Sequence, residues 1–262
     1  MKASVVFLGT GGSLGVPVIG CSCAVCASAT PFNRRLRPSA FLKIGTKRFV
    51  LDVGPDFREQ ALRYQIDRLD GALFSHAHYD HIGGIDELRI YAFRNKRPVP
   101  CLVSSATLEE LKKRYDYLLS TEHARAVVRE KLSFQLLEHE RGRTLFEEVE
   151  IGYVSYFQLG MKVTGFQIGT FAYLTDLLDY STTLFDALQT IDVLVLSGRR
   201  MERSIAHLSI DEALAFAART SARTVYLTHL SHEIDHRVES HRLPQHVQLA
   251  YDGLEIPIEY RP

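Results

Sequence analysis

Three histidines and an aspartate lie within six residues, in the run His76-Ala77-His78-Tyr79-Asp80-His81. Imidazole nitrogen and carboxylate oxygen are the ligands that divalent metals such as zinc, manganese and iron take in proteins. The alternative, a polar loop that is rich in histidine by chance, explains a lone histidine better than it explains this spacing. We therefore predict that His76, His78, Asp80 and His81 bind metal.

The segments on either side of this run predict regular elements that hold it in place. The apolar residues 69–74 predict a short buried strand, and residues 85–93 predict a helix that follows a turn at Gly83-Gly84. Ligands at the end of a strand are held by a rigid element, as a reactive metal site requires.

Four more candidate ligands lie near the ends of predicted elements. Asp176 and His229 each follow a predicted strand, and His207 precedes a predicted helix over residues 210–220. His232 lies three residues after His229. Side chains that project beyond one edge of a layered fold can converge, so these placements make a shared site possible.

Three of the four cysteines form a second cluster, Cys21-Ser22-Cys23-Ala24-Val25-Cys26. In a reducing compartment such spacing indicates metal binding rather than disulfides. Three thiolates are one short of a closed tetrahedral zinc site, so the fourth ligand must come from far along the chain. Without that ligand the three remain free thiols in a loop. Cys101 lies in an apolar segment and is expected to be an ordinary buried cysteine.

The composition is that of a compact globular enzyme. The chain has 262 residues, of which 46% are hydrophobic and 24% charged, and its formal net charge is zero. Zero net charge argues against a strong electrostatic grip on nucleic acid, and the arginines at 34, 35 and 37 are expected to be solvated. The sequence shows no signal-peptide pattern and no membrane-length apolar run, so we expect a cytoplasmic protein without a membrane partner.

The order of the predicted elements indicates the fold class. Strands come first as a run, over residues 3–8, 40–44 and 47–52, and then alternate with helices, twice. Later strands are predicted over residues 193–196 and 225–228, and a small hairpin at Asp252-Gly253 joins two strands at the end. This pattern predicts an α/β fold in which helices flank two β-sheets, in one domain over residues 1–262.

Several motifs together resemble the metallo-β-lactamase superfamily, and more narrowly its PhnP-like cyclic phosphodiesterases. The motifs are FLGTGGSLGVPVIGCSCAVC at 7–26, LDVGPDFREQALR at 51–63, HAHYDH at 76–81, AYLTD at 172–176, HLSIDEAL at 207–214 and LTHLSHEIDH at 227–236. The metal motif alone is typical of the whole superfamily, whereas its combination with the glycine loop and the cysteine cluster is more specific. A characterised member of this family opens phosphoribosyl 1,2-cyclic phosphate.

The resemblance implies a four-layer αββα sandwich with two divalent ions, zinc or manganese, at one edge. It implies that His76 and His78 bind one ion, that Asp80, His81 and His229 bind the other, and that Asp176 bridges them. It also implies that His207 meets the substrate phosphate and donates a proton, with Asp80 as the second catalytic residue. The structural zinc loop at 20–27 would hold its ion with four residues, Cys21, Cys23, Cys26 and His232.

One position departs from the family pattern. The first metal normally takes a further histidine shortly before the strand that ends in the bridging aspartate, and Gln158 holds that place. A glutamine carbonyl oxygen is a neutral ligand that binds zinc more weakly than imidazole does. Two interpretations stay open. Either the first-metal site is weak, half-occupied or tuned to manganese, or water completes its shell and the change is harmless.

The predicted ligands indicate a hydrolase. Two divalent ions about 3.5–4 Å apart can hold a hydroxide near neutral pH and stabilise charge on the attacked group. We therefore expect a phosphodiesterase that opens a small cyclic or aryl phosphodiester, with a small molecule as its partner; a homodimer is compatible with the chain. The alternatives are a non-catalytic or weakly active binding protein, motivated by Gln158, and a tRNA 3′-processing-like nuclease or a thioester or lactone hydrolase. The neutral charge argues against the nuclease, and the absent signal peptide argues against a secreted β-lactamase.

Overall fold

Two mixed β-sheets of seven strands each form the centre of the molecule in the computed structural model, which describes residues 2–119 and 131–260. In the first sheet the strand order is β14-β1-β2-β3-β4-β5-β6, and in the second it is β13-β12-β11-β10-β9-β8-β7. The first sheet contains β1 (Lys2–Gly9), β2 (Ser39–Ile44), β3 (Lys47–Leu51), β4 (Gly71–Leu73), β5 (Val99–Ser104), β6 (Leu132–Leu137) and β14 (Glu255–Glu259). The second contains β7 (Arg141–Phe146), β8 (Val149–Gln158), β9 (Met161–Ile168), β10 (Phe171–Leu174), β11 (Val193–Ser197), β12 (Thr224–Thr228) and β13 (Val247–Leu249).

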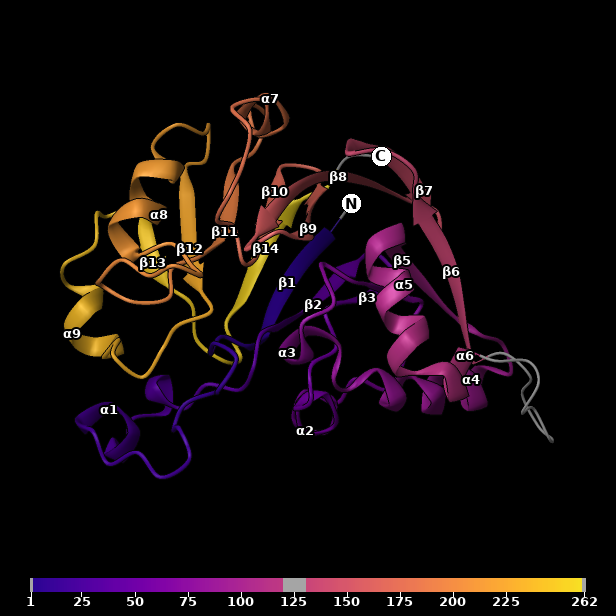
Figure 1. The fold of residues 1–262 in the computed structure, drawn as a ribbon, viewed down its shortest axis with the longest axis horizontal. Coiled ribbons are helices and arrows are strands. Elements are labelled where there is room, and N and C mark those ends of the chain that lie inside the picture. The colour runs from indigo at the N-terminus through magenta and orange to yellow at the C-terminus, as the bar shows by residue number, and fades with distance from the viewer. Residues whose placement is uncertain (1, 120–130, 261–262) are drawn as a thin grey trace.

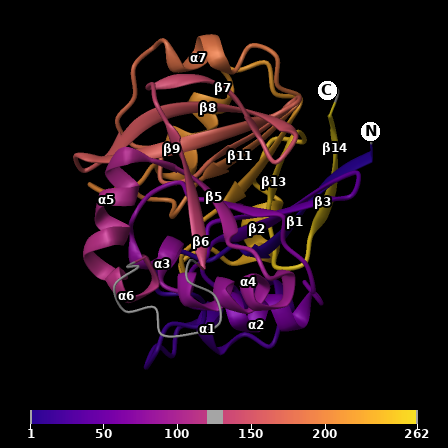
Figure 2. The same cartoon turned by 90° about the vertical axis from the view of Figure 1, so that its right-hand side faces the viewer.

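Helices cover the outer faces of both sheets (Figures 1 and 2). They are α1 (Ala24–Ala27), α2 (Phe57–Arg63), α3 (Tyr79–Ile82), α4 (Arg89–Asn95), α5 (Ser105–Arg114), α6 (Asp116–Leu119), α7 (Leu184–Ala187), α8 (Ile210–Ala217) and α9 (His236–Ser240), with 3-10 turns η1 (Pro31–Asn33) and η2 (Ile85–Leu88). Figure 2 shows α7 outside the second sheet and α2 and α4 outside the first. The predicted four-layer αββα sandwich is therefore confirmed.

Side-chain alternation along the strands builds this layering. In β1, Val5 and Phe7 face the core between the two sheets, whereas Val6 and Leu8 pack under the helices of the first sheet. In β10, Phe171 and Tyr173 face the same central core. Because both faces of these strands are buried, they carry apolar residues at nearly every position instead of alternating with polar ones.

Helix α8 shows how the sequence sets a helix start. Ser209 accepts from the backbone N–H of Glu212, and the Glu212 carboxylate accepts from the backbone N–H of Ser209, which forms a capping box. The apolar residues Ile210, Ala213 and Phe216 are buried on one face. The predicted helix over 210–220 is thus confirmed, although it ends earlier, at Ala217.

The predicted C-terminal hairpin is wrong. Strand β13 pairs in parallel with β12 in the second sheet, whereas β14 pairs antiparallel with β1 in the first. The turn between them is tied to the N-terminal loop, since the Asp252 carboxylate accepts from the backbone N–H and hydroxyl of Thr10 and from the N–H of Leu36. A turn signal such as Asp-Gly predicts a chain reversal, but distant contacts decide which sheet each strand joins.

Within the described residues, no helix has the length and apolar composition needed to cross a membrane.

Candidate metal centre

Three strands deliver acidic or imidazole side chains to one edge of the sandwich. Asp52 follows β3, Asp176 follows β10 and His229 follows β12. All three adopt positive φ angles, of 60°, 52° and 61° respectively. This conformation costs an ordinary residue about 1–2 kcal/mol, and such strain persists where the surroundings fix a functional geometry. The fold therefore holds these three side chains at the edge of the sandwich at the cost of backbone strain.

The histidine run follows β4 and leads into α3. His76 Nε2 lies 2.9 Å from His78 Nδ1. His81 Nε2 lies 2.9 Å from Asp176 Oδ2 and 3.5 Å from Asp80 Oδ2. His76, Asp80 and His81 are buried, and His78 is half-buried. Residues that are distant in sequence thus place their ligand atoms within direct reach of one another.

The second half of the chain completes this group. His229 Nε2 lies 3.3 Å from Asp80 Oδ2 and 3.5 Å from Asp176 Oδ1. Three overlapping sets have ligand atoms within 4.8 Å of one another: His76, His81 and Asp176; Asp80, His81 and His229; and Asp176, His207 and His229.

The arrangement fits divalent cations. His81 Nε2 is buried without a hydrogen-bond partner, although it faces two carboxylates. Burial lowers the pKa of His81, but the attraction of Asp80, Asp52 and Asp176 outweighs this effect and holds the pKa well above its ordinary value. For Asp176, burial raises the pKa, but His229 and His81 hold it well below the ordinary range. The carboxylates therefore favour positive charge at this point, and a cation would satisfy them without a proton on His81.

Asp52 fixes the orientation of His81, although it is not among the site residues predicted from the sequence. Its Oδ2 accepts from His81 Nδ1 at 2.7 Å and from the Ser75 hydroxyl at 2.7 Å, while its Oδ1 accepts from the Ser75 backbone N–H at 2.8 Å. An imidazole that donates one N–H to a carboxylate presents its other nitrogen as a lone pair. The available signal was its position: Asp52 follows a strand, as Asp176 and His229 do.

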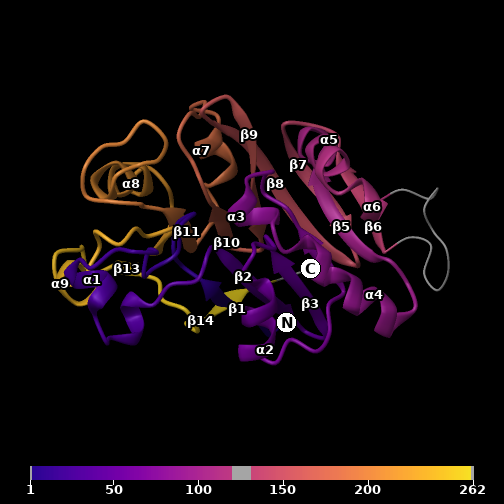
Figure 3. The same ribbon diagram turned by 60° about the horizontal axis from the view of Figure 1, so that its bottom comes forward.

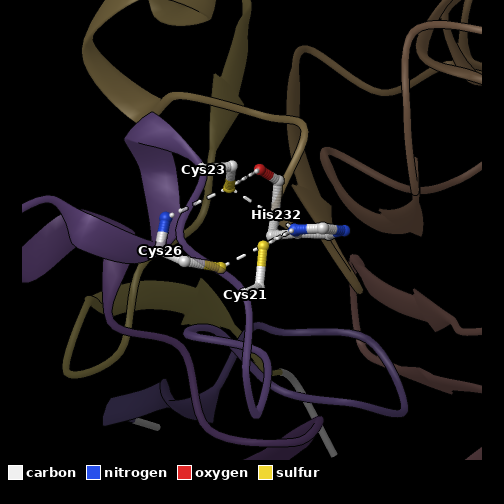
Figure 4. A group of neighbouring side chains, drawn as sticks. All are labelled: Cys21, Cys23, Cys26 and His232. Atoms are coloured by element: carbon white, nitrogen blue, oxygen red, sulfur yellow. Dashed lines mark hydrogen bonds between the residues drawn. The ribbon is translucent and has the colours of Figure 1, made fainter.

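The cysteine cluster meets His232 in a second site (Figure 4). The Sγ atoms of Cys21, Cys23 and Cys26 lie 3.3, 3.5 and 3.6 Å from His232 Nδ1. Zinc bonds of about 2.3 Å to sulfur and 2.0–2.1 Å to nitrogen, at a tetrahedral angle, place these atoms roughly 3.5 Å apart. The four side chains therefore match the dimensions of a closed zinc site.

The thiols differ in electrostatic environment. The backbone N–H of Cys26 lowers the pKa of Cys23 to about 6, whereas burial raises the pKa of Cys26. Cys23 is also the N-cap of α1, where its Sγ accepts from that N–H. Figures 1 and 3 show α1 lying near α9, so segments that are more than 200 residues apart in sequence meet here.

Comparison with known proteins agrees with this geometry. Residues 47–230 match the family described as "Beta-lactamase superfamily domain". The crystal structure of a diphosphatase from the PhnP family superposes with a TM-score of 0.90 at 33% identity, covering 99% of this chain and 98% of that one. The chain belongs to the PhnP family of the metallo-β-lactamase superfamily. It is accordingly a hydrolase fold whose members use divalent metal.

More distant matches show the fold alone. Zinc-bound PqqB from Methylobacterium extorquens has a TM-score of 0.77 at 17% identity, covering 97% of this chain and 99% of that one. The short form of human tRNase Z has a TM-score of 0.69 at 18% identity, over 97% and 98%. A curated protein, the octanoyltransferase of Porphyromonas gingivalis strain W83, is 29% identical over 264 residues. This PhnP-family chain is covered to 97% in that match and spans about half (51%) of the relative.

Gln158, which departs from the PhnP-family pattern, lies beside Asp176 and His207 in this site. Gln158 is the last residue of β8 and is buried, and its Nε2 lies 3.0 Å from Asp176 Oδ1. His207 Nδ1 lies 3.0 Å from the same oxygen. Burial lowers the pKa of His207, although Asp176 opposes this effect.

The structure thus gathers every candidate active-site residue from the sequence at one edge, and every candidate structural-zinc residue at a second place. Their roles as ligands, and the role of Gln158 as a ligand, stay predictions.

The expectation of solvated arginines is wrong for Arg35, which is 2% exposed. Its guanidinium donates to the backbone carbonyls of Ser231 and Ile234 at 2.9 and 2.8 Å. A loop arginine can be buried when carbonyl oxygens satisfy its donors, and no local pattern in the sequence reveals such partners.

Proposed function

We propose that this chain is a metal-dependent phosphodiesterase that hydrolyses a small cyclic or aryl phosphodiester. The observation that carries the proposal is the meeting of His76, Asp80, His81, Asp176 and His229 at one edge, with His207 beside Asp176. The 33% identity to a PhnP-family diphosphatase supports a phosphorus-containing substrate. The proposal assigns two divalent ions, zinc or manganese, to the edge of the sandwich and one zinc to the cysteine cluster.

The side chains have separable tasks in this proposal. The ions, when bound, supply Lewis acidity and a hydroxide nucleophile near neutral pH. Asp80 and Asp176 provide the negative charge that holds positive charge at the site. His207 Nδ1–H donates to Asp176, and in the protonated form of the ring Nε2 carries a second proton, which it gives to the leaving alkoxide to become neutral.

The test is turnover by the purified, metal-loaded protein. We expect hydrolysis of an aryl phosphodiester with manganese or zinc, and we expect His76→Ala to abolish it. His139→Ala is the matched control, since His139 is exposed and lies outside the site. Absence of turnover in a protein that binds its metals would contradict the proposal and favour a binding protein of the same fold.

A thioester hydrolase is the second candidate. The match to half of an octanoyltransferase favours it, because a metal pair that activates water also attacks carbonyl carbon. An octanoyl thioester assayed beside the phosphodiester separates the two activities. Faster hydrolysis of the thioester, measured as kcat/KM, would favour the second candidate.

A further inference from the structure

The amide of Gln158 has its orientation fixed by two acceptors. Its Nε2 lies 3.0 Å from Asp176 Oδ1 and 2.9 Å from the backbone carbonyl oxygen of Ala206. A carbonyl oxygen only accepts, and so does an ionised carboxylate. The NH2 group must therefore face them, and both of its hydrogens are used.

This arrangement also fixes the tautomer of His207. Its Nδ1 lies 3.1 Å from Gln158 Nε2 and 3.0 Å from Asp176 Oδ1. With both amide hydrogens occupied, Gln158 has none left for His207. A bare Nδ1 would instead set its lone pair against the carboxylate. Nδ1 is thus the protonated nitrogen, and it donates to Asp176.

Gln158 also holds the chain that carries His207. Its bond to Ala206 restrains the peptide that leads into His207. From the other side, the Ser204 hydroxyl accepts from the backbone N–H of Ala206 and of His207, at 3.3 and 3.1 Å. The position of the imidazole is therefore set at its backbone by Gln158 and Ser204, and at its ring by Asp176.

We propose that Gln158 is a positioning residue for His207 and not a metal ligand. Its NH2 group, and not its oxygen, is the side-chain atom group that faces Asp176, and an amide NH2 group does not bind metal. Its Oε1 is buried without a partner among the described residues. The inference rests on the proposed phosphodiesterase activity, in which His207 protonates the leaving group.

Gln158→Met tests this role, because methionine fills similar volume but has no N–H donor and no hard oxygen. We expect the variant to bind the same number of ions with unchanged affinity, measured by elemental analysis and by competition with a chelator. With a 2′,3′-cyclic nucleotide, whose leaving alkoxide needs a proton, we expect kcat to fall by roughly 10–100-fold. With bis(4-nitrophenyl) phosphate, whose leaving group needs none, we expect a change of less than about threefold.

A double-mutant comparison separates positioning from general damage. His207→Asn keeps a donor toward Asp176 but removes the acid, and we expect Gln158→Met to add almost no further loss to it. Gln167→Met is the matched control, since Gln167 lies on the neighbouring strand β9 and its side-chain amide donates to Gly169 and Thr190, away from His207. We expect this control to leave both substrates unaffected.

Two outcomes would overturn the proposal. The loss of one bound ion in Gln158→Met, with both substrates slowed alike, would show that Gln158 is a ligand. Additive losses in the double variant would show that it acts independently of His207. If the wild-type protein hydrolyses neither substrate, the proposed function fails, and nitrogen NMR of the His207 ring still tests the inference. There we expect one sharp set of ring signals with Nδ1 protonated in the wild-type protein, and signals broadened by motion of the ring in Gln158→Met, where the restraint at Ala206 is lost. Identical spectra would overturn the inference.

Discussion

Asp52 and His81 form a buried pair in which the His81 Nδ1–H donates to Asp52 Oδ2 at 2.7 Å. Asp52 and His81 are both almost fully buried, so solvent does not compete for the bond. The pair holds His81 Nε2 toward Asp80 and Asp176. A residue that is not itself a candidate ligand therefore sets the geometry of one that is.

We expect Asp52→Asn to weaken binding of the active-site metal by roughly 10–100-fold, the usual effect of losing such a supporting carboxylate. Both carboxylate oxygens of Asp52 accept hydrogen bonds, whereas the asparagine amide has only one acceptor oxygen. The His81 ring therefore loses the contact that fixes its tautomer. Chelator competition measures the affinity. Asp70→Asn is the control, since Asp70 is also buried but accepts from Arg48 and Arg68, away from the site. Equal metal affinity in the two variants would contradict the supporting role of Asp52.

We expect Cys23→Ser to lose roughly one zinc per chain and to unfold at a lower temperature, because structural zinc contributes folding free energy. Serine lacks the thiolate, whose formation is favoured here by the Cys26 N–H. Elemental analysis and thermal unfolding measure the two effects. Cys101→Ala serves as the control because Cys101 is buried away from the cluster, and it should keep its zinc. A Cys23→Ser protein with unchanged zinc content would show that the cluster is not a metal site.

The sequence predicts the layers and the candidate ligands because both depend on local signals. Apolar runs identify the buried strands, and His76, Asp176 and His229 stand directly beyond such runs. The ligand types and spacing of residues 76–81 are visible in the sequence itself, so this metal motif can be recognised without tertiary information.

Other features depend on contacts between distant segments, which local patterns do not contain. Asp52 looks like any acid at a strand end until His81 is placed beside it. Likewise, β13 and β14 look like a hairpin until Asp252 is seen to bind Thr10 and Leu36. Gln158 is visible as a departure, but only its contacts with Ala206 and His207 suggest what it does.

His236 makes the stability of the fold depend on pH. Burial, helped by Arg35, lowers the pKa of His236 to about 4, and its ring stacks on Phe32. Because the folded-state pKa lies below the ordinary 6.5, protons bind the unfolded chain more readily. The stabilisation is therefore present above pH 6.5 and is lost as the pH falls toward 4.

We expect His236→Phe to remove this loss. Phenylalanine keeps the ring contact and costs no side-chain bond, since His236 Nδ1 is buried without a partner in the described part of the chain. The free energy of unfolding, measured with urea, should favour the variant increasingly as the pH falls from 7 to 4. A difference between variant and wild type that stays constant over this range would contradict the assignment.

Arg35 ties both metal sites together. It donates to the carbonyls of Ser231 and Ile234, and these residues flank His232 and follow His229. The segment therefore carries one candidate ligand for each site, and the Arg35 guanidinium bonds to two of its carbonyls. Lysine keeps the charge but lacks the planar fork that reaches two acceptors at once. We expect Arg35→Lys to lower the free energy of unfolding by about 1–3 kcal/mol, because a buried carbonyl is left without a donor.

The same substitution should weaken metal binding at both sites, because the segment that Arg35 holds carries a candidate ligand for each. Elemental analysis under chelator challenge should show zinc leaving the cysteine cluster and the active-site ions leaving the edge at lower chelator concentrations than in the wild-type protein. Arg34→Lys provides the control because Arg34 is exposed. If Arg35→Lys releases ions from only one site, the segment from His229 to His232 does not move as a unit, and the two sites are positioned independently.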